Sequence, residues 1–136
     1  MNPVLWLRIS SIVSLLFAAG HTLGGRRVWS PVGENAVLAA MRMTRFDVQG
    51  VSRTYLDFYR GFGYSLSVSM LLQAIVLWQL CAIAATNPAQ VRPILGTFAV
   101  ASAAGVVLSW VFLFPVPAVF SAVLTACLAV TFLAAK

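Results

Sequence analysis

The sequence contains one histidine and three acidic residues among 136, so few side chains can exchange a proton near neutral pH. His21 lies near the end of a first apolar stretch, and Asp57, Tyr59 and Arg60 lie at the start of a second. If consecutive stretches form antiparallel helices, these two ends lie at the same depth. We therefore expect His21, Asp57 and Arg60 to converge on one rim of a helical bundle, where they could orient a bound group or exchange a proton with it.

The spacing after Asp57 supports a shared surface. Asp57, Arg60, Tyr64 and Ser67 are separated by three, four and three residues, which places them on one face of a helix. In the predicted site Arg60, helped by Arg53, pairs with an anionic headgroup, and His21 and Asp57 are the candidates for catalysis if any chemistry occurs. The predicted ligand-binding residues are His21, Trp29, Arg53, Tyr55, Asp57, Tyr59, Arg60, Tyr64 and Phe114.

Each of the three ionisable residues also has a purely structural interpretation. His21 could bond the last carbonyls of its helix, where a cation is favourable. Asp57 could be only the capping partner of Thr54, three residues earlier. Arg60 could extend its side chain to lipid headgroups. The sequence leaves these alternatives open.

The composition identifies the class of element that must position these residues. Hydrophobic residues make up 61% of the chain and charged residues 9%, whereas about 25% of a typical soluble domain is charged. This composition excludes an ordinary soluble enzyme, a disordered chain and a disulfide-rich secreted module. Four apolar stretches reach the about 20 residues that a membrane-spanning helix needs, at residues 4–23, 58–85, 93–114 and 116–135. We predict one membrane domain over residues 1–136, an all-α, four-transmembrane-helix antiparallel bundle.

The connections refine this prediction. Pro93 is expected to open the third span, and Pro115 to Pro117 to form a tight turn before the fourth. The long loop 24–57 is expected to lie at the interface and to hold a short amphipathic helix over 31–45 that covers the site. Ser30-Pro31 is typical of a helix start, and a Thr54–Asp57 cap should begin the second span. Six of the nine basic residues lie in or beside this loop, which predicts that it is cytoplasmic.

Small residues recur at four-residue steps in three of the spans, which favours close helix packing or a homo-oligomer contact. The three stripes are Gly61, Ser65 and Ser69; Ala101, Gly105 and Ser109; and Ala118, Ala122 and Ala126.

Several classes of site find no support in the sequence. No His, Cys or carboxylate set has metal-ligand spacing, so we expect no metal site and no cofactor. Cys81 and Cys127 lie in separate spans and form no redox motif. The net charge of +6 favours anionic lipid headgroups as partners, and not nucleic acid.

Three segments of the chain carry a resemblance. The run from Gly20 to Gly25 (GHTLGG), the run RFDVQG at 45–50 and the run RTYLDFYRGFG at 53–63 are similar to a family of small uncharacterised bacterial four-span inner-membrane proteins. The resemblance covers the first two spans and their loop. It implies a bacterial source and a cytoplasmic-membrane location, and it implies no activity.

We expect an integral membrane protein that binds an amphipathic, anionic lipid or a small hydrophobic ligand at the loop-side rim, and an enzyme is the less favoured class. One alternative is a structural or accessory subunit, or a homo-oligomer, in a larger membrane complex. A second is a membrane enzyme of lipid or quinone metabolism.

Overall fold

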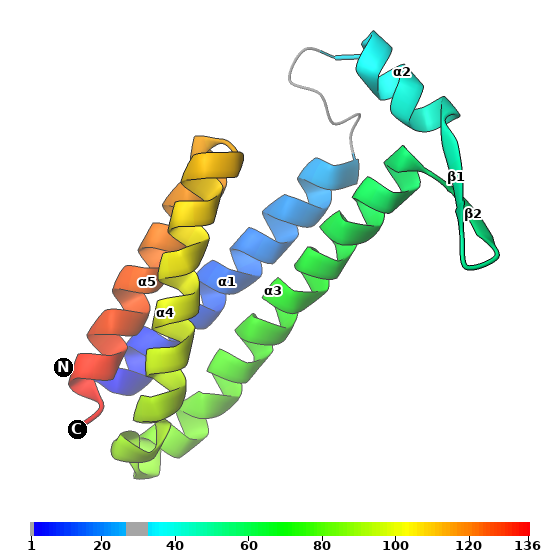
Figure 1. Cartoon of the computed structure of the whole chain (residues 1–136). Coiled ribbons are helices and arrows are strands. Elements are labelled where there is room, and N and C mark those ends of the chain that lie inside the picture. The colour runs from blue at the N-terminus through cyan, green and yellow to red at the C-terminus, as the bar shows by residue number, and fades with distance from the viewer. Residues whose placement is uncertain (1, 27–32) are drawn as a thin grey trace. The chain divides into compact units, whose positions relative to one another are not determined.

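The computed structural model describes residues 2–26 and 33–136 (Figure 1). Its elements follow one another as helix α1 (Pro3–Arg26), helix α2 (Ala36–Met43), strands β1 (Arg45–Val48) and β2 (Val51–Thr54), and helices α3 (Tyr55–Thr86), α4 (Pro88–Phe112) and α5 (Pro115–Ala134). Helices α1, α3, α4 and α5 are long and apolar enough to cross a membrane. The prediction of an all-α fold with four spans and a short helix in the first loop is confirmed.

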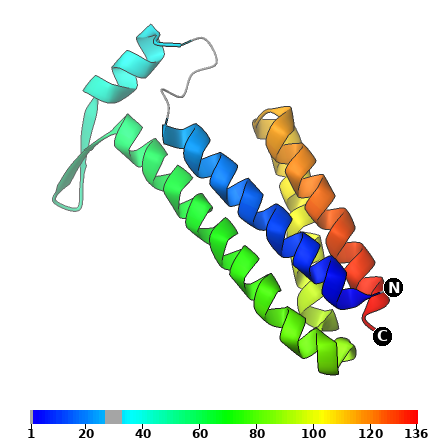
Figure 2. The same cartoon turned by 180° about the vertical axis from the view of Figure 1, so that it is seen from behind.

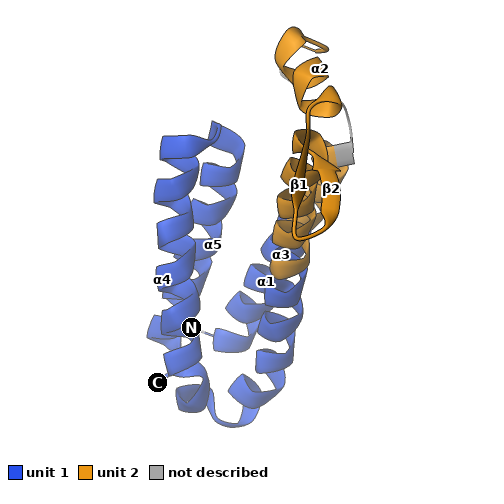
Figure 3. Ribbon diagram, turned by 45° about the vertical axis from the view of Figure 1, so that its right-hand side comes forward, with its two compact units in different colours: residues 1–17, 70–136 blue, residues 18–69 orange. Residues whose placement is uncertain are grey.

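The chain forms two compact units (Figure 3). Unit 1 comprises residues 1–17 and 70–136, and unit 2 comprises residues 18–69. Helices α1 and α3 each have one part in unit 1 and another part in unit 2.

Unit 1 is built around leucines from all four long helices. Leu7 of α1, Leu77 of α3, Leu95 of α4 and Leu128 of α5 are fully buried and belong to one cluster. Figures 1 and 2 show α4 and α5 side by side. A Cβ atom added at Gly105 of α4 would lie 3.4 Å from the Ser121 hydroxyl oxygen of α5. The absence of a side chain at Gly105 therefore permits this close pairing, and the predicted tight hairpin of the last two spans is confirmed.

Polar contacts between α1 and α3 also lie in unit 1. The Ser11 hydroxyl donates a hydrogen bond to the backbone carbonyl of Ala74 at 2.7 Å, and the Ser14 hydroxyl donates to the carbonyl of Met70 at 3.3 Å. Both serines are buried. Such hydrogen bonds between helices stabilise a bundle whose surroundings supply no hydrophobic driving force.

Two of the sequence-based boundaries need correction. The third span begins at Pro88, directly after its N-cap Asn87, and Pro93 lies inside the helix. Pro88 can occupy the first turn because the amide hydrogen that it lacks would have no partner there, and this leaves no need for a start at Pro93. The second span begins at Tyr55, three residues before the predicted start at residue 58.

The predicted small-residue stripe of α3 is not covered by the described parts of the chain. Gly61, Ser65 and Ser69 are exposed, and the two serine hydroxyls bond back to carbonyls of their own helix. In α5, Ala118 is buried as expected, but Ala122 and Ala126 are exposed. A four-residue step exceeds the helical repeat of 3.6 residues, so a stripe rotates around its helix, and the neighbouring helices decide which part of it is covered.

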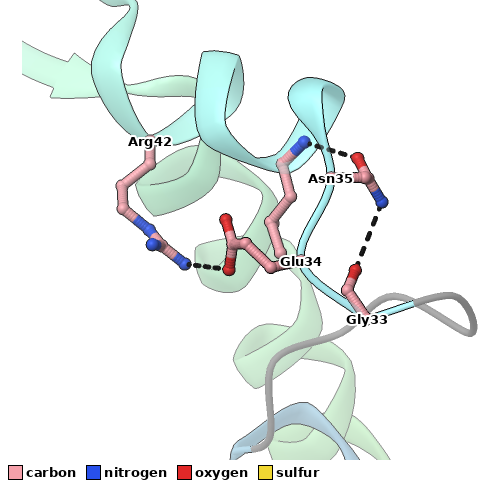
Figure 4. A network of polar contacts seen from close by, with 5 residues as sticks. Gly33, Glu34, Asn35 and Arg42 are labelled. Atoms are coloured by element: carbon pink, nitrogen blue, oxygen red, sulfur yellow. Dashed lines mark hydrogen bonds and ion pairs between the residues drawn. The ribbon is translucent and has the colours of Figure 1, made fainter.

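Unit 2 contains the predicted loop helix in a shorter form. Helix α2 begins after Asn35, whose side chain accepts a hydrogen bond from the Leu38 amide at 3.0 Å (Figure 4). Arg42 pairs with Glu34 at 3.3 Å in the same network. The expected helix start at Ser30-Pro31 lies outside the described residues, and the described helix covers residues 36–43 of the predicted 31–45.

Strands β1 and β2 form an antiparallel hairpin that the sequence analysis did not predict. Its two-residue turn has positive φ angles at Gln49 (53°) and Gly50 (78°). This pair of angles is typical of the hairpin turns whose twist matches that of the flanking strands. The signals in the sequence were the alternation of Phe46, Asp47 and Val48 and the glycine at position 50.

Candidate ligand site

The carboxylate of Asp57 takes part in a reciprocal cap at the start of α3. The Asp57 amide donates a hydrogen bond to the Thr54 hydroxyl oxygen at 3.0 Å, and the Thr54 amide donates to Asp57 Oδ2 at 3.1 Å. This arrangement is the predicted capping box, which satisfies two backbone donors at the helix start. The predicted Thr54–Asp57 cap is therefore confirmed.

His21 contacts a serine two turns of α3 beyond Arg60. Its Nδ1 atom lies 2.9 Å from the Ser67 hydroxyl oxygen, and that hydroxyl donates to the backbone carbonyl of Gly63 at 3.2 Å. A serine hydroxyl carries one hydrogen. When Ser67 donates that hydrogen to Gly63, its oxygen accepts from Nδ1–H of His21, and Nε2 of the neutral imidazole carries the lone pair.

The imidazole also lies beside Gly63, although a Cβ atom there would make only an ordinary contact with the ring. A Cβ atom added at Gly63 would lie 4.0 Å from His21 Cε1. The Ser67 side chain is buried, and His21 is half-buried. The end of α1 is therefore joined to α3 through one oriented histidine within unit 2.

Arg60 has no such partner. Its side chain is exposed, and in the described part of the chain the one ion pair joins Arg42 and Glu34. Helical spacing places Arg60 on the same face of α3 as Ser67, two turns away, with Tyr64 between them. Tyr64 is 45% exposed.

Aromatic rings occupy a different face of α3. Phe46 of β1 lies 5.1 Å from Tyr55 and 5.7 Å from Phe58, and Phe58 lies 4.9 Å from Phe62, measured between ring centroids. We call these four residues the aromatic row. Arg60 follows Phe58 by two residues, which is roughly 200° around the helix. The predicted site residues of α3 are thus divided between two faces of the helix.

Arg53 lies with Arg45 on the hairpin. Arg53 Nη1 donates to the Ser52 carbonyl oxygen at 2.9 Å, and Arg45 donates to the Ser52 hydroxyl at 3.1 Å and to its carbonyl at 3.4 Å. A guanidinium group has five N–H donors. Both guanidinium groups are therefore held at Ser52. Each still has N–H groups that can donate hydrogen bonds to an anion.

Three predicted residues remain. Trp29 lies outside the described residues. Tyr59 is 43% exposed. Phe114 is 46% exposed and belongs to unit 1, whereas His21 belongs to unit 2.

Among residues 2–26 and 33–136, no hydrogen bond or ion pair joins His21, Asp57 and Arg60 to one another. His21 and Asp57 belong to separate sets of contacts, and Arg60 belongs to neither. In the same residues, no three His, Cys, Asp or Glu side chains are grouped so as to hold a metal ion. The sequence analysis placed Ser67 on the right face but missed its bond to His21, and it did not include Phe46, Phe58, Phe62 or Arg45 in the site.

The four long apolar helices among the described residues identify the chain as a helical membrane protein. No family model, curated protein or solved structure matches it.

Proposed function

We propose that the protein binds an anionic amphiphile on the face of α3 that carries Arg60, Tyr64 and Ser67, beside His21 of α1. The observation that carries this proposal is the exposed guanidinium of Arg60, which lies in the second turn of an apolar helix without a carboxylate partner in the described residues.

The physical reason is the cost of a charge beside lipid. An ionisable side chain near hydrocarbon is favourable only when it reaches water or pairs with an opposite charge. Guanidinium groups bind carboxylates and phosphates through two parallel hydrogen bonds. An anionic lipid or fatty acid therefore satisfies Arg60 with its headgroup and covers the neighbouring apolar surface with its chain.

His21 and Asp57 have different roles in this proposal. Asp57 holds the helix start and does not contact the ligand. The Nε2 lone pair of His21 accepts a hydrogen bond from a hydroxyl group of the ligand, while Ser67 fixes the orientation of the ring.

Native mass spectrometry of the purified protein in a neutral detergent tests the proposal, with phosphatidylglycerol as the probe. We expect Arg60→Gln to lose most of the bound phosphatidylglycerol. Arg42→Gln is the matched control, because Arg42 is already paired with Glu34, and it should keep wild-type binding. Equal binding by wild type and Arg60→Gln contradicts the proposal. A loss with His21→Ala alone would assign the headgroup to the imidazole and not to the guanidinium.

The location belongs to the same proposal. The resemblance and the basic loop support a bacterial cytoplasmic membrane with loop 24–57 on the cytoplasmic side. A reporter enzyme that is active only in the periplasm, fused after Lys136, should then be active. An inactive fusion that is nevertheless stably inserted would reverse the orientation.

The exposed stripe of Gly61, Ser65 and Ser69 favours a second candidate function, a subunit that associates with itself or with a larger membrane complex. Disulfide crosslinking of Ser65→Cys in native membranes distinguishes the two forms of association. A product of twice the chain mass supports self-association, a heavier product supports another subunit, and no product at all contradicts this candidate.

A further inference from the structure

The hairpin has two chemically different faces. Its register pairs Val48 with Val51 and Phe46 with Arg53. Side chains alternate between faces along a strand, and directly paired residues share a face. Phe46, Val48, Val51 and Arg53 therefore lie on one face, which we call the apolar hairpin face. Its two valines are 55% and 44% exposed.

The opposite hairpin face is polar. It carries the pairs Arg45 with Thr54 and Asp47 with Ser52. The hydrogen bond from Arg45 to the Ser52 hydroxyl agrees with this division, because it joins two residues of the same face.

The apolar hairpin face continues into the aromatic row of α3. Phe46 belongs to both, since it packs on Tyr55 and Phe58. Phe58 is 54% exposed and Phe62 is 66% exposed. Exposed apolar side chains therefore occur both on the hairpin and on the first two turns of α3, and Phe46 connects the two groups. In a water-soluble protein such a surface is a site of interaction.

The position of this surface indicates what covers it. The hairpin lies beside the first turn of α3 through the Phe46–Phe58 contact, and it diverges from the helix toward its turn (Figures 1 and 2). Helix α3 has 32 residues, which rise about 48 Å, whereas the hydrocarbon core is about 30 Å thick. Helix α3 therefore extends beyond the core, and Asp57 and Arg60 near its start place its first turns, with the hairpin attached to them, in the headgroup layer. The hairpin cannot lie deeper, because its two outer edges leave backbone hydrogen-bonding groups unpaired.

The charges of the hairpin are matched to anionic headgroups. Arg45 and Arg53 are both held at Ser52, and Asp47 is the one carboxylate on the hairpin. The other two acidic residues of the chain are engaged elsewhere, Glu34 with Arg42 and Asp57 with Thr54.

We propose that the hairpin is a lipid-binding element that lies in the headgroup layer of an anionic bilayer. The apolar hairpin face and the aromatic row contact acyl chains, and Arg45 and Arg53 bind lipid phosphates. This surface lies on a different side of α3 from Arg60, so the inference goes beyond the ligand site proposed above.

Site-directed spin labelling tests the placement. Single cysteines at Val48 and at the neighbouring Asp47 carry the label in a Cys81→Ala/Cys127→Ala background, in liposomes of equal parts phosphatidylcholine and phosphatidylglycerol. We expect the label at Val48 to be relaxed mainly by oxygen, which concentrates in the acyl region. The label at Asp47 should be relaxed mainly by a water-soluble nickel complex. Equal accessibility of both labels to the nickel complex overturns the proposal.

A photo-crosslinking residue at Val51, with Ser52 as the matched control, repeats the test with both native cysteines in place. Lipid adducts found by mass spectrometry at Val51 and not at Ser52 support the proposal, and adducts at neither position contradict it.

The arginines are tested by lipid composition. When Arg45 and Arg53 are both present, the difference in depth between the labels at Val48 and Asp47 should shrink when phosphatidylglycerol is omitted from the liposomes. The variant Arg45→Gln/Arg53→Gln should show the smaller difference in both lipid mixtures. If its depth profile equals that of the wild type, the assignment of the phosphates to these arginines is wrong. Arg60 is intact in these variants, so this failure is distinct from a failure of the Arg60 site.

Discussion

Two adjacent buried serines of α1 allow the stability contributed by an interhelical hydrogen bond to be measured. Ser11 donates to the carbonyl of Ala74 on α3 at 2.7 Å. Ser10 donates to the carbonyl of Trp6 in its own helix at 2.9 Å. Their side chains are 6% and 0% exposed. The two serines therefore differ chiefly in whether the hydrogen bond joins two helices.

The expected magnitudes follow from the partners. When helices separate inside a membrane they remain helical, so the Ser10 bond persists and the Ser11 bond is lost. Ser11→Ala removes a donor but leaves the Ala74 carbonyl its bond within α3, so no polar group is orphaned. We expect Ser11→Ala to destabilise the bundle by about 0.6–1.7 kcal/mol, the range of such bonds between membrane helices. That corresponds to roughly a 3- to 20-fold change in the unfolding equilibrium. Ser10→Ala should have a much smaller effect.

Reversible unfolding in mixed micelles with increasing SDS, followed by tryptophan fluorescence, measures both variants. Trp6 and Trp78 lie on the two helices concerned, so the signal reports their separation. If Ser10→Ala destabilises the protein as much as Ser11→Ala, hydrogen bonds between helices do not account for the stability of this pair.

Three further predictions use the same unfolding assay, hydrogen exchange or the hairpin labels. Gly105→Leu should destabilise the α4–α5 pair by about 1–3 kcal/mol, since an added Cβ atom alone would lie 3.4 Å from Ser121. Gly61→Leu is its control, because a Cβ atom added there would meet no neighbouring atom of the described residues within 4 Å, and an equal loss would refute the packing argument. Thr54→Ala should destabilise the first turn of α3 by about 1 kcal/mol through the lost helix cap, measured as faster hydrogen exchange of its first amides, because the SDS assay leaves bonds within one helix intact. Combining it with Asp57→Ala should cost less than the sum of the two single effects. Full additivity would show that the two side chains do not act as one cap. Gly50→Val places a β-branched residue at a φ of 78°, so the labels at Val48 and Asp47 should lose their difference in depth, and a retained difference would mean that the turn does not depend on glycine.

The sequence by itself determined the elements whose signals are local. An apolar stretch of about 20 residues predicts a membrane helix from length and composition alone, and four such helices were found. The Thr54–Asp57 cap was also predicted, because both partners lie three residues apart in one short segment. Helix α2 was predicted in type, although its cap at Asn35 was not.

The hairpin segment also has local sequence signals for strands, but these signals were too weak to predict the hairpin. Its strands have four residues each, too few for a strong alternation, and Arg45 fitted equally well at the end of a helix. The loop–helix contact of Phe46 with Phe58 could not be inferred without the hairpin that brings β1 back to α3.

Only the tertiary structure decided which face of each helix is covered. Four-residue steps of small residues fit several faces equally well, and the chain packs α3 through Gly63 and Ser67 while Gly61 and Ser65 stay exposed. The partner of His21 depends on the same rotation of α3, because a shift of one residue turns the helix by about 100° and would move Ser67 away from the imidazole. The length and composition of a segment predict whether it can cross the membrane. Which side chains touch depends on how two helices are rotated against each other.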